Sequence, residues 1–530
     1  MKYPIGIQSF EQIINDGYVY VDKTDLVYQL TLGKIYFLSR PRRFGKSLLV
    51  STLENYYLGK KELFKGLKID ALEKEWKTYP VFHLDFNGKN YNDKDALIET
   101  LTGFVEEQEA QYGRDPYHNS IGDRFAYALK SAHQQTGHRC VVLIDEYDKP
   151  LLDVMDLPEK IRINNVDITL EENHRNILKA FYSTFKLADA DLQFVLLTGV
   201  TKFSQISVFS GFNQPNDISM DNQFDALCGI TDDELEFYFK SAIQELADNY
   251  GYSYEEMHEV LRRQFDGYHF GNRLKGVYNP FSILNTFFKM DIRDYWFRTG
   301  TPTYLVRLLQ DSNENLNDLT GKYYDESEFV DYRADKEKPL PMIYQSGYLT
   351  IKGFDREMRT YLLDFPNDEV KKGFLTMTAN SYLATKEDAG SWVRSAVIAL
   401  KRGELEKFKT LLTSFLSSIP YTARRKENET EKERYFTYTL YLIFRIASCY
   451  ITYIEKEQSY GRLDCCVETS EHVYIFEFKL DGSAEAALKQ IDDMGYAKEF
   501  LASEKIIHKI GVNISSETGT VADWKVEEEK

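Results

Sequence analysis

Apolar runs alternate with amphipathic stretches through the first part of the chain. Four runs are continuous and rich in β-branched or aromatic residues, which is typical of strands buried on both faces of a parallel sheet. They span residues 34–39, 81–86, 140–145 and 193–200. Between them, stretches such as LLVSTLENYYLG and ALIETLTGFVEEQEAQYG repeat apolar residues at helical spacing. This alternation predicts an α/β domain over residues 1–230, with a parallel sheet and helices on both of its faces.

The pattern becomes helical from Thr231 onwards. The stretch TDDELEFYFKSAIQELADNYG opens with a capping box, Thr231 with Glu234, and ends at Gly251. Two more helices are predicted by SYEEMHEVLRRQF and FSILNTFFKM, with a turn-rich hairpin, DGYHFGNRLKGVYNP, between them. We therefore predict a helical lid or winged-helix-like module over residues 231–335.

The last third of the chain mixes both patterns. Strand patterns over 339–368 predict connecting strands at 336–368. A last α/β domain is expected over 369–530. It begins helical, and its stretch YGRLDCCVETSEHVYIFEFKLDGSAEAALKQI predicts a β-hairpin followed by a helix. Several domains also agree with a length of 530 residues, which exceeds what one hydrophobic core usually holds.

Charge and cysteine content restrict the partners. A formal net charge of −18 means that any DNA or RNA contact must come from a local basic site. The five cysteines are scattered without a C-x-x-C pair, so a disulfide framework or zinc site is disfavoured and a reducing cytoplasm is expected. Residues 435–454 have the length of a membrane span, but Arg445 interrupts them. We predict a buried helix running into a buried strand there, and no membrane partner.

The segment LSRPRRFGKSLL combines part of a phosphate-binding motif with three arginines. In G-x-x-x-x-G-K-[ST], backbone N–H groups and a helix N-terminus surround the phosphates, the lysine neutralises them, and the hydroxyl holds Mg²⁺. Gly45, Lys46 and Ser47 are in place between a predicted strand and a predicted helix. GKS alone is a common tripeptide, so an arginine-rich surface loop is the alternative.

The arginines are the departure from the motif. Arg40 stands where the first glycine is expected, and Pro41 can set a tight turn there. Arg42 and Arg43 either add positive charge to the phosphate pocket or face water. We expect both to be nucleotide-binding residues, together with the Gly-Lys-Ser tripeptide.

A second motif, CVVLIDEYDKP, supports a nucleotide site. Asp145 and Glu146 follow a predicted core strand, and the carboxyl ends of parallel strands are where open α/β sheets bind ligands. Asp145 is predicted to hold Mg²⁺, and Glu146 to orient or deprotonate the attacking water. An acidic loop after a core strand is the alternative. The order strand–GKS–helix, then strand–DE, favours a site for ATP and Mg²⁺.

A third constellation lies near the C-terminus. If Ser470 and Glu471 form the two-residue turn of the hairpin, Asp464 lies directly across from Glu477. Lys479 is two residues further along and shares that face. Opposed carboxylates are destabilising unless a cation lies between them, and Mg²⁺ suits their oxygen atoms. Lys479 would then position the water that attacks a phosphodiester. An amphipathic edge hairpin with a solvated face is the alternative.

These motifs resemble a known family. SRPRRFGKSLL, LIDEYDKP and TGVTKFSQISVFSGFN are similar to segments of the bacterial AAA-ATPase-like proteins that carry a PD-(D/E)XK nuclease-like C-terminus. YWFRTGTPTYLV and YQSGYLTIKG extend the resemblance over nearly the full length. It implies that RPRRFGKS is the family's form of Walker A and LIDE its Walker B. By analogy with other AAA-type ATPases, Thr198–Thr201 would sense the γ-phosphate. No arginine finger stands out, so no oligomer is predicted.

The same resemblance implies a restriction-endonuclease-like α/β fold for the last domain. The D-x(12)-E-x-K spacing matches this superfamily, although Leu463 replaces the proline of the motif. Gln490, in the following helix, and Glu433, upstream, occupy positions at which related nucleases place a helper glutamine and an acid. Alternatively, Gln490 is an ordinary residue on a helix surface and Glu433 is part of a charged run.

Two functions follow from these observations. The first is an ATP-binding and hydrolysing protein coupled to a Mg²⁺-dependent nuclease domain that acts on nucleic-acid phosphodiesters. The alternative is a nucleotide-dependent switch or interaction protein whose nuclease-like domain is a catalytically silent scaffold. The complete Asp-Glu-Lys set favours the first function. The acidic composition and the lack of a basic stripe favour the second.

Overall fold

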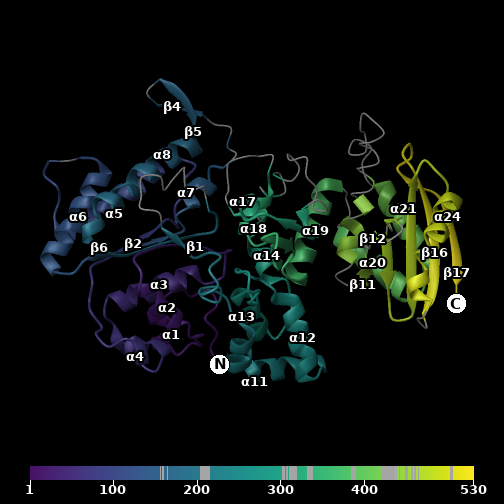
Figure 1. Ribbon diagram of the computed structural model, residues 1–530, viewed down its shortest axis with the longest axis horizontal. Coiled ribbons are helices and arrows are strands. Elements are labelled where there is room, and N and C mark those ends of the chain that lie inside the picture. The colour runs from purple at the N-terminus through teal and green to yellow at the C-terminus, as the bar shows by residue number, and fades with distance from the viewer. Residues whose placement is uncertain are drawn as a thin grey trace. The chain divides into compact units, whose positions relative to one another are not determined.

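A five-stranded parallel sheet forms the centre of the N-terminal region in the computed structural model (Figure 1). The strand order is β2-β3-β6-β1-β7, and each neighbouring pair is parallel. The strands are β1 (Ile35–Ser39), β2 (Val81–Asp85), β3 (Cys140–Asp145), β6 (Leu192–Gly199) and β7 (Asn216–Asp217). The first four coincide with the predicted strands, and the parallel α/β architecture is confirmed. The short edge strand β7 was not predicted.

The described residues form two compact units, the first comprising 1–301 with 319–367 and the second including 368–530. The finer boundaries expected after 230 and 335 stay predictions. The structure describes residues 1–117, 119–155, 157, 160–163, 165–202, 215–300, 305, 308, 319–330, 338–383, 389–418, 436, 439–440, 442–447, 452–454, 457–458, 461–462, 465–501 and 505–529.

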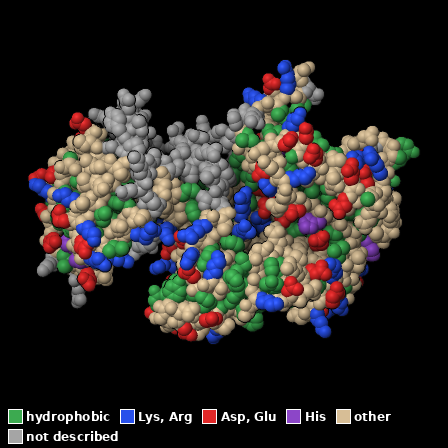
Figure 2. Space-filling view, turned by 180° about the vertical axis from the view of Figure 1, so that it is seen from behind, with side chains coloured by type: hydrophobic (Ala, Val, Ile, Leu, Met, Phe, Trp, Pro, Cys, Tyr) green, Lys and Arg blue, Asp and Glu red, His purple; other side chains and the backbone are tan. Residues whose placement is uncertain are grey.

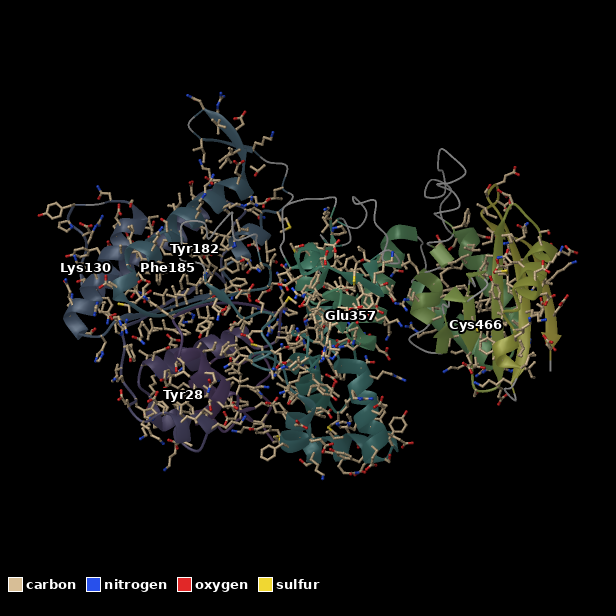
Figure 3. All side chains as sticks on the ribbon, in the orientation of Figure 1. Tyr28, Lys130, Tyr182, Phe185, Glu357 and Cys466 are labelled. Carbon is tan, nitrogen blue, oxygen red and sulfur yellow. The ribbon has the colours of Figure 1, made fainter. Side chains whose placement is uncertain are left out.

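Helices cover both faces of the parallel sheet (Figure 1). One face carries α1 (Phe10–Asn15), α2 (Thr24–Thr31), α3 (Lys46–Tyr57) and α4 (Lys68–Leu72). The other face carries α5 (Ala96–Tyr112), α6 (Ile121–Thr136), α7 (Lys149–Leu152) and α8 (Leu170–Tyr182), which runs into α9 (Thr184–Leu187). Between the helices of the second face, Phe125 stacks on Phe181, and Tyr182 stacks on Phe185. Tyr182 and Phe185 are labelled in Figure 3. A hairpin of β4 (Lys160–Ile163) and β5 (Val166–Thr169) projects before α8.

The region after the sheet is helical, as predicted. It contains α11 (Asp232–Tyr250), α12 (Tyr254–Phe265), α13 (Pro280–Lys289) and α14 (Tyr295–Gly300). The predicted capping box of α11 is present, because the Thr231 hydroxyl accepts the Glu234 N–H and the Glu234 carboxylate accepts the Thr231 N–H. The helix ends at Gly251 in the left-handed conformation, with φ 70°. The turn-rich stretch after α12 closes through an antiparallel bridge between Tyr268 and Val277.

A three-stranded antiparallel sheet completes the first unit. Its order is β8-β10-β9, from β8 (Lys322–Tyr324), β9 (Thr350–Asp355) and β10 (Thr360–Asp364). Two short helices lie beside these strands in the sequence, α17 (Glu326–Phe329) and α18 (Leu340–Gln345). The strands expected within 336–368 are present as β9 and β10, whereas residues 340–345 form the helix α18, which was not predicted. Its short apolar run does not distinguish a helix from a strand, and Pro341 fits the first turn of a helix.

The second unit begins with helices and ends in a mixed sheet. The helices are α19 (Asp368–Leu383), α20 (Ala389–Lys401) and α21 (Leu405–Ser418). The sheet has the order β11-β14-β15-β16-β17. Its strands are β11 (Thr452–Ile454), β14 (Cys465–Glu468), β15 (His472–Leu480), β16 (Ile506–Ser515) and β17 (Thr520–Glu529). α24 (Ala484–Met494) connects the parallel neighbours β15 and β16. The short strands β12 (Glu457–Gln458) and β13 (Gly461–Arg462) pair separately.

The predicted hairpin register is confirmed over the described residues. Cys465 pairs with Phe476, and Glu468 with Val473, as the two-residue turn at 470–471 requires. Across the described ranges, no helix has the length and hydropathy needed to cross a membrane. Within the stretch examined as a possible span, residues 442–447 are helical and mostly buried.

Candidate functional site

The phosphate-binding motif lies between β1 and α3, in the context that the motif requires. Gly45 caps α3 with φ 97°, a conformation that glycine adopts without strain. Arg43 is also left-handed, with φ 69°. Left-handed residues alternating with ordinary ones turn successive N–H groups to one side, which makes an anion-binding concavity. Lys46 begins the helix and is buried, and its Nζ donates to the carbonyl of Arg40 at 3.1 Å.

The acidic motif at Asp145 and Glu146 lies next to Lys46. Asp145 is the last residue of β3 and is 2% exposed, and its Oδ1 accepts hydrogen bonds from the Thr198 hydroxyl at 2.5 Å and the Glu146 N–H at 3.1 Å. Glu146 has φ 52°, and its Oε1 lies 3.5 Å from Lys46 Nζ. Ser47 follows Lys46 in the first turn of α3 and is partly buried. Lys46 of one predicted motif and Glu146 of the other thus lie together, with Asp145 bonded to the Glu146 N–H.

The C-terminal constellation is described in part. Glu477 lies on β15 and is 1% exposed, and Lys479 donates from Nζ to its Oε1 at 3.1 Å. Lys479 also donates to Oε1 of Gln490, on α24, at 2.5 Å. Asp464, Leu463 and Glu433 lie outside the described residues, so the predicted opposition of Asp464 and Glu477 stays a prediction. No group of three or more His, Cys, Asp or Glu side chains within the described ranges could hold a metal ion.

Comparison with known proteins identifies the family. Residues 4–209 match the model of a family described as a predicted AAA-ATPase, and residues 431–524 match the PD-(D/E)XK nuclease superfamily. The chain is also similar to an uncharacterized protein in the vnfD 5' region of Azotobacter chroococcum mcd 1, with 34% identity over 532 residues and 99% of each chain covered. The chain belongs to the AAA-ATPase-like proteins with a C-terminal PD-(D/E)XK nuclease superfamily domain. The expected family and α/β multidomain fold are confirmed.

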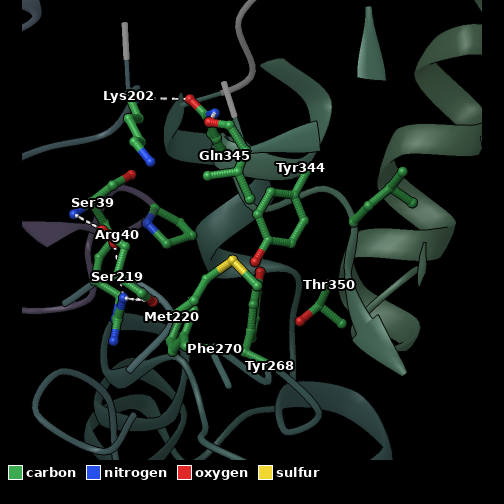
Figure 4. Close-up of a pocket in the computed structure, with 13 residues that line it drawn as sticks. Ser39, Arg40, Lys202, Ser219, Met220, Tyr268, Phe270, Tyr344, Gln345 and Thr350 are labelled. Atoms are coloured by element: carbon green, nitrogen blue, oxygen red, sulfur yellow. Dashed lines mark hydrogen bonds between the residues drawn. The ribbon is translucent and has the colours of Figure 1, made fainter. Parts of the chain in front are cut away.

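Arg40, at the position where the motif predicts its first glycine, is buried inside the AAA-ATPase-like domain. It is 1% exposed, and burial lowers the pKa of its guanidinium. Nη1 donates to the carbonyls of Ser39 at 2.9 Å and Ser219 at 2.7 Å, and the guanidinium lies 4.0 Å from the Phe270 ring centroid (Figure 4). Arg40 therefore anchors the loop to other segments of the first unit through its side chain.

Arg42 and Arg43, the other two arginines of the loop between β1 and α3, are exposed. The Arg43 guanidinium lies 5.0 Å from the Phe281 ring centroid, and the Arg42 carbonyl accepts a hydrogen bond from Trp296 Nε1 at 2.9 Å. The two residues before the buried Phe44 thus tie the loop to α13 and α14. Binding of nucleotide by Arg42 and Arg43 stays a prediction.

An apolar cavity of about 110 Å³ adjoins the phosphate-binding loop of the AAA-ATPase-like domain. Sequence reasoning did not find it, because its walls come from segments far apart in the chain. Residues near the N-terminus, the start of α3, the 227–230 turn and the helices α11 and α13 all contribute. Lys23 is among the few polar side chains in its wall, and its Nζ lies 2.5 Å from Oε2 of Glu234. Gly45 lines the cavity as well, so the cavity is continuous with the loop.

Asp148, in the turn that follows β3, is a further residue whose role was not predicted from the sequence. It is fully buried, and its Oδ2 accepts the N–H groups of Val200 at 3.0 Å and Thr201 at 2.6 Å. Burial, reinforced by the charge of Glu146, raises the pKa of Asp148 from 3.8 to about 7. The fourth position of DEYD was visible in the sequence as an acid, but nothing there showed that it fixes the strand end predicted to sense the γ-phosphate.

Asp148→Asn is expected to weaken the pH dependence of stability. Since the pKa of Asp148 is raised on folding, the folded chain holds an extra proton between pH 3.8 and about 7. The free energy of unfolding therefore falls as pH rises through this window, by about 1.4 kcal/mol per pH unit from this group at most. Asparagine does not titrate, so urea unfolding across the window should give a flatter profile for the variant. Parallel profiles for the variant and the wild type would contradict a protonated Asp148.

Proposed function

We propose that this protein binds and hydrolyses ATP with Mg²⁺, and that its C-terminal domain cleaves nucleic-acid phosphodiesters with Mg²⁺. The observation that carries the proposal is the meeting of Lys46 and Glu146 at 3.5 Å, at the carboxyl edge of the parallel sheet. A buried lysine beside the N-terminus of α3 supplies positive charge where phosphates would bind. The adjacent carboxylate of Glu146 can act as the base that accepts a proton from the attacking water.

The chain's own groups divide the work of ATP hydrolysis. The N–H groups of the loop around Gly45 and the Lys46 ammonium bind the phosphates, with Arg42 and Arg43 at the exposed rim. The apolar cavity beside Gly45 suits the base of the nucleotide. Glu146 accepts a proton from the attacking water.

The Ser47 hydroxyl and the Asp145 carboxylate offer oxygen atoms alone, the donor type that Mg²⁺ prefers. Bound there, Mg²⁺ would neutralise charge on the phosphates. Because Thr198 and the Glu146 N–H both bond to Oδ1 of Asp145, they fix the orientation of that carboxylate.

In the nuclease domain, Glu477 and Asp464 are the proposed oxygen ligands of Mg²⁺. Lys479 would position the attacking water and stabilise charge on the phosphodiester. Its ammonium is already fixed between Glu477 and Gln490, so this part of the site is preorganised. Gln490 acts as the proposed helper residue by orienting Lys479.

A nucleotide-dependent switch is the second candidate function. The net charge of −18 favours it, because a surface that is acidic overall repels the nucleic-acid backbone. On the face drawn in Figure 2, acidic and basic side chains are intermixed over the coloured surface. In this function the nuclease-like domain binds a partner without cleaving it, and ATP controls the partner's access.

Glu146→Gln distinguishes binding from hydrolysis at the N-terminal site. The variant keeps the shape of the side chain but cannot take the proton, so we expect ATP hydrolysis to fall roughly 100-fold or more. Affinity for a fluorescent ATP analogue should stay within a few fold of wild type. Glu62→Gln, at an exposed position, is the matched control and should hydrolyse normally. Equal hydrolysis by Glu146→Gln and wild type would remove Glu146 from the proposal.

A further inference from the structure

Hydrogen bonds hold the successive residues at and after the end of β6. The Thr198 hydroxyl bonds to Asp145, and the N–H groups of Val200 and Thr201 bond to Asp148, both within the Walker B turn. The N–H of Lys202, the next group along, bonds instead to Oε1 of Gln345 at 2.8 Å (Figure 4). The strand end therefore lies between the nucleotide site and α18.

Gln345 is itself fixed by a second bond. It is 6% exposed, and its Nε2 donates to the carbonyl of Val330, next to α17. A buried amide that uses its acceptor on Lys202 and its donor on Val330 has one rotamer that satisfies both groups. Movement of the Lys202 backbone by about an ångström would break one of these bonds, because hydrogen bonds weaken steeply with distance and angle.

The Walker A loop touches the same element. A Cβ placed on Gly347, in the turn after α18, would lie 2.7 Å from Cβ of Pro41. Gly347 has φ 88°, so neither the space nor the backbone there accepts another residue. Thr201 adds a contact from its hydroxyl to Sδ of Met342 at 3.8 Å. The loop before α3 and the end of β6 thus both contact residues 340–349. In the chain these residues are followed by β9 and β10, which end the first unit.

We propose that Gln345 is a positioning residue for ATP hydrolysis, an inference that rests on the proposed ATPase. It acts through the backbone of Thr201 and Lys202, keeping the predicted γ-phosphate sensor in register with Asp145. Through the same bond, a change of the phosphates in the site reaches α18. The residue contacts no substrate, so its loss affects turnover and leaves nucleotide affinity nearly unchanged.

The test compares three variants of the full chain. Gln345→Met removes both hydrogen bonds at similar volume, and it should lower kcat roughly tenfold with the Kd for a fluorescent ATP analogue within twofold of wild type. Gln345→Glu restores the pair of bonds only when protonated, so its kcat relative to wild type should rise as pH falls. Gln108→Met, a buried glutamine on α5, is the control and should hydrolyse normally.

Amide hydrogen exchange supplies a readout that does not depend on turnover. In wild type, ATPγS with Mg²⁺ should slow exchange in residues 340–349 relative to ADP, and Gln345→Met should abolish this difference. The inference would be overturned if Gln345→Met kept the wild-type kcat or lost ATP affinity as much as it lost kcat. It would also be overturned by a kcat ratio of Gln345→Glu to wild type that does not change with pH, or by equal exchange of residues 340–349 with ATPγS and with ADP in the wild type. A wild-type chain that binds ATPγS without hydrolysing ATP would overturn the proposed ATPase instead, and exchange would still decide the coupling to α18.

Discussion

Lys46→Ala is expected to abolish ATP binding, with a loss of affinity of roughly 100-fold or more. The lysine Nζ is buried against the loop carbonyls and lies 3.5 Å from Glu146. Removing it takes away the main positive charge offered to the phosphates and leaves the Glu146 carboxylate to repel them. A 100-fold loss corresponds to about 2.7 kcal/mol, within the range of a charge-assisted hydrogen bond at a buried site. Titration with a fluorescent ATP analogue, with and without Mg²⁺, measures it.

Two comparisons make this result specific. Lys61→Ala removes an exposed lysine from the same domain and should bind ATP like wild type. Thermal melting of both variants shows whether the fold survives, since loss of a buried side chain can destabilise the domain on its own. A folded Lys46→Ala variant with unchanged affinity would mean that LSRPRRFGKSLL does not bind the phosphates of ATP.

The fold was predictable where burial imposes a pattern on the sequence. The four core strands lie in continuous apolar runs because both faces of a parallel sheet are covered, and β3 is buried at every residue. The capping box at Thr231 and the hairpin turn at 470–471 involve residues only a few positions apart in the chain, so local rules sufficed. The strand–GKS–helix order and the rule that open α/β sheets bind ligands at the carboxyl ends of their strands placed Lys46, Asp145 and Glu146 at one edge of the sheet.

The contacts that an individual polar side chain makes in the fold were not predictable from the sequence. The sequence placed Arg40 at the position of the motif's first glycine but gave no partner for its side chain, whereas the guanidinium lies on Phe270 and bonds to the carbonyl of Ser219. These partners lie far away along the chain, and no periodicity encodes them. Asp148 was missed for a similar reason, because its role depends on the N–H groups of β6 and on complete burial.

Loop curvature explains why the missing glycine is tolerated. The first glycine of the motif normally lets the backbone turn tightly around the phosphates. Here the left-handed residues are Arg43 and Gly45, at the end of the loop, and Arg40 continues the line of β1 with its N–H bonded to the carbonyl of Gly199. A side chain at position 40 therefore costs no backbone strain, and its burial fastens the loop.

Glu477→Ala is expected to abolish metal-dependent cleavage of nucleic acid, with a rate loss of roughly 1,000-fold or more. Glu477 is buried on β15 and bonds to Lys479, so its removal takes away a proposed Mg²⁺ ligand and one of the two groups that hold the lysine. Single- and double-stranded DNA and RNA, each with Mg²⁺ or Mn²⁺ and with or without ATP, cover the substrates that the proposal allows. Gel analysis of the end-labelled strands measures cleavage.

Glu468→Ala is the matched control for this experiment. It removes a glutamate from the neighbouring strand β14, where the carboxylate pairs with Lys505 at 2.7 Å, and it should cleave like wild type. Cleavage by Glu477→Ala at the wild-type rate would place the chemistry elsewhere. A wild-type chain that cleaves none of these substrates, while binding ATP, would favour the switch function. The intact Glu477–Lys479–Gln490 contact would then be a structural feature of a binding scaffold.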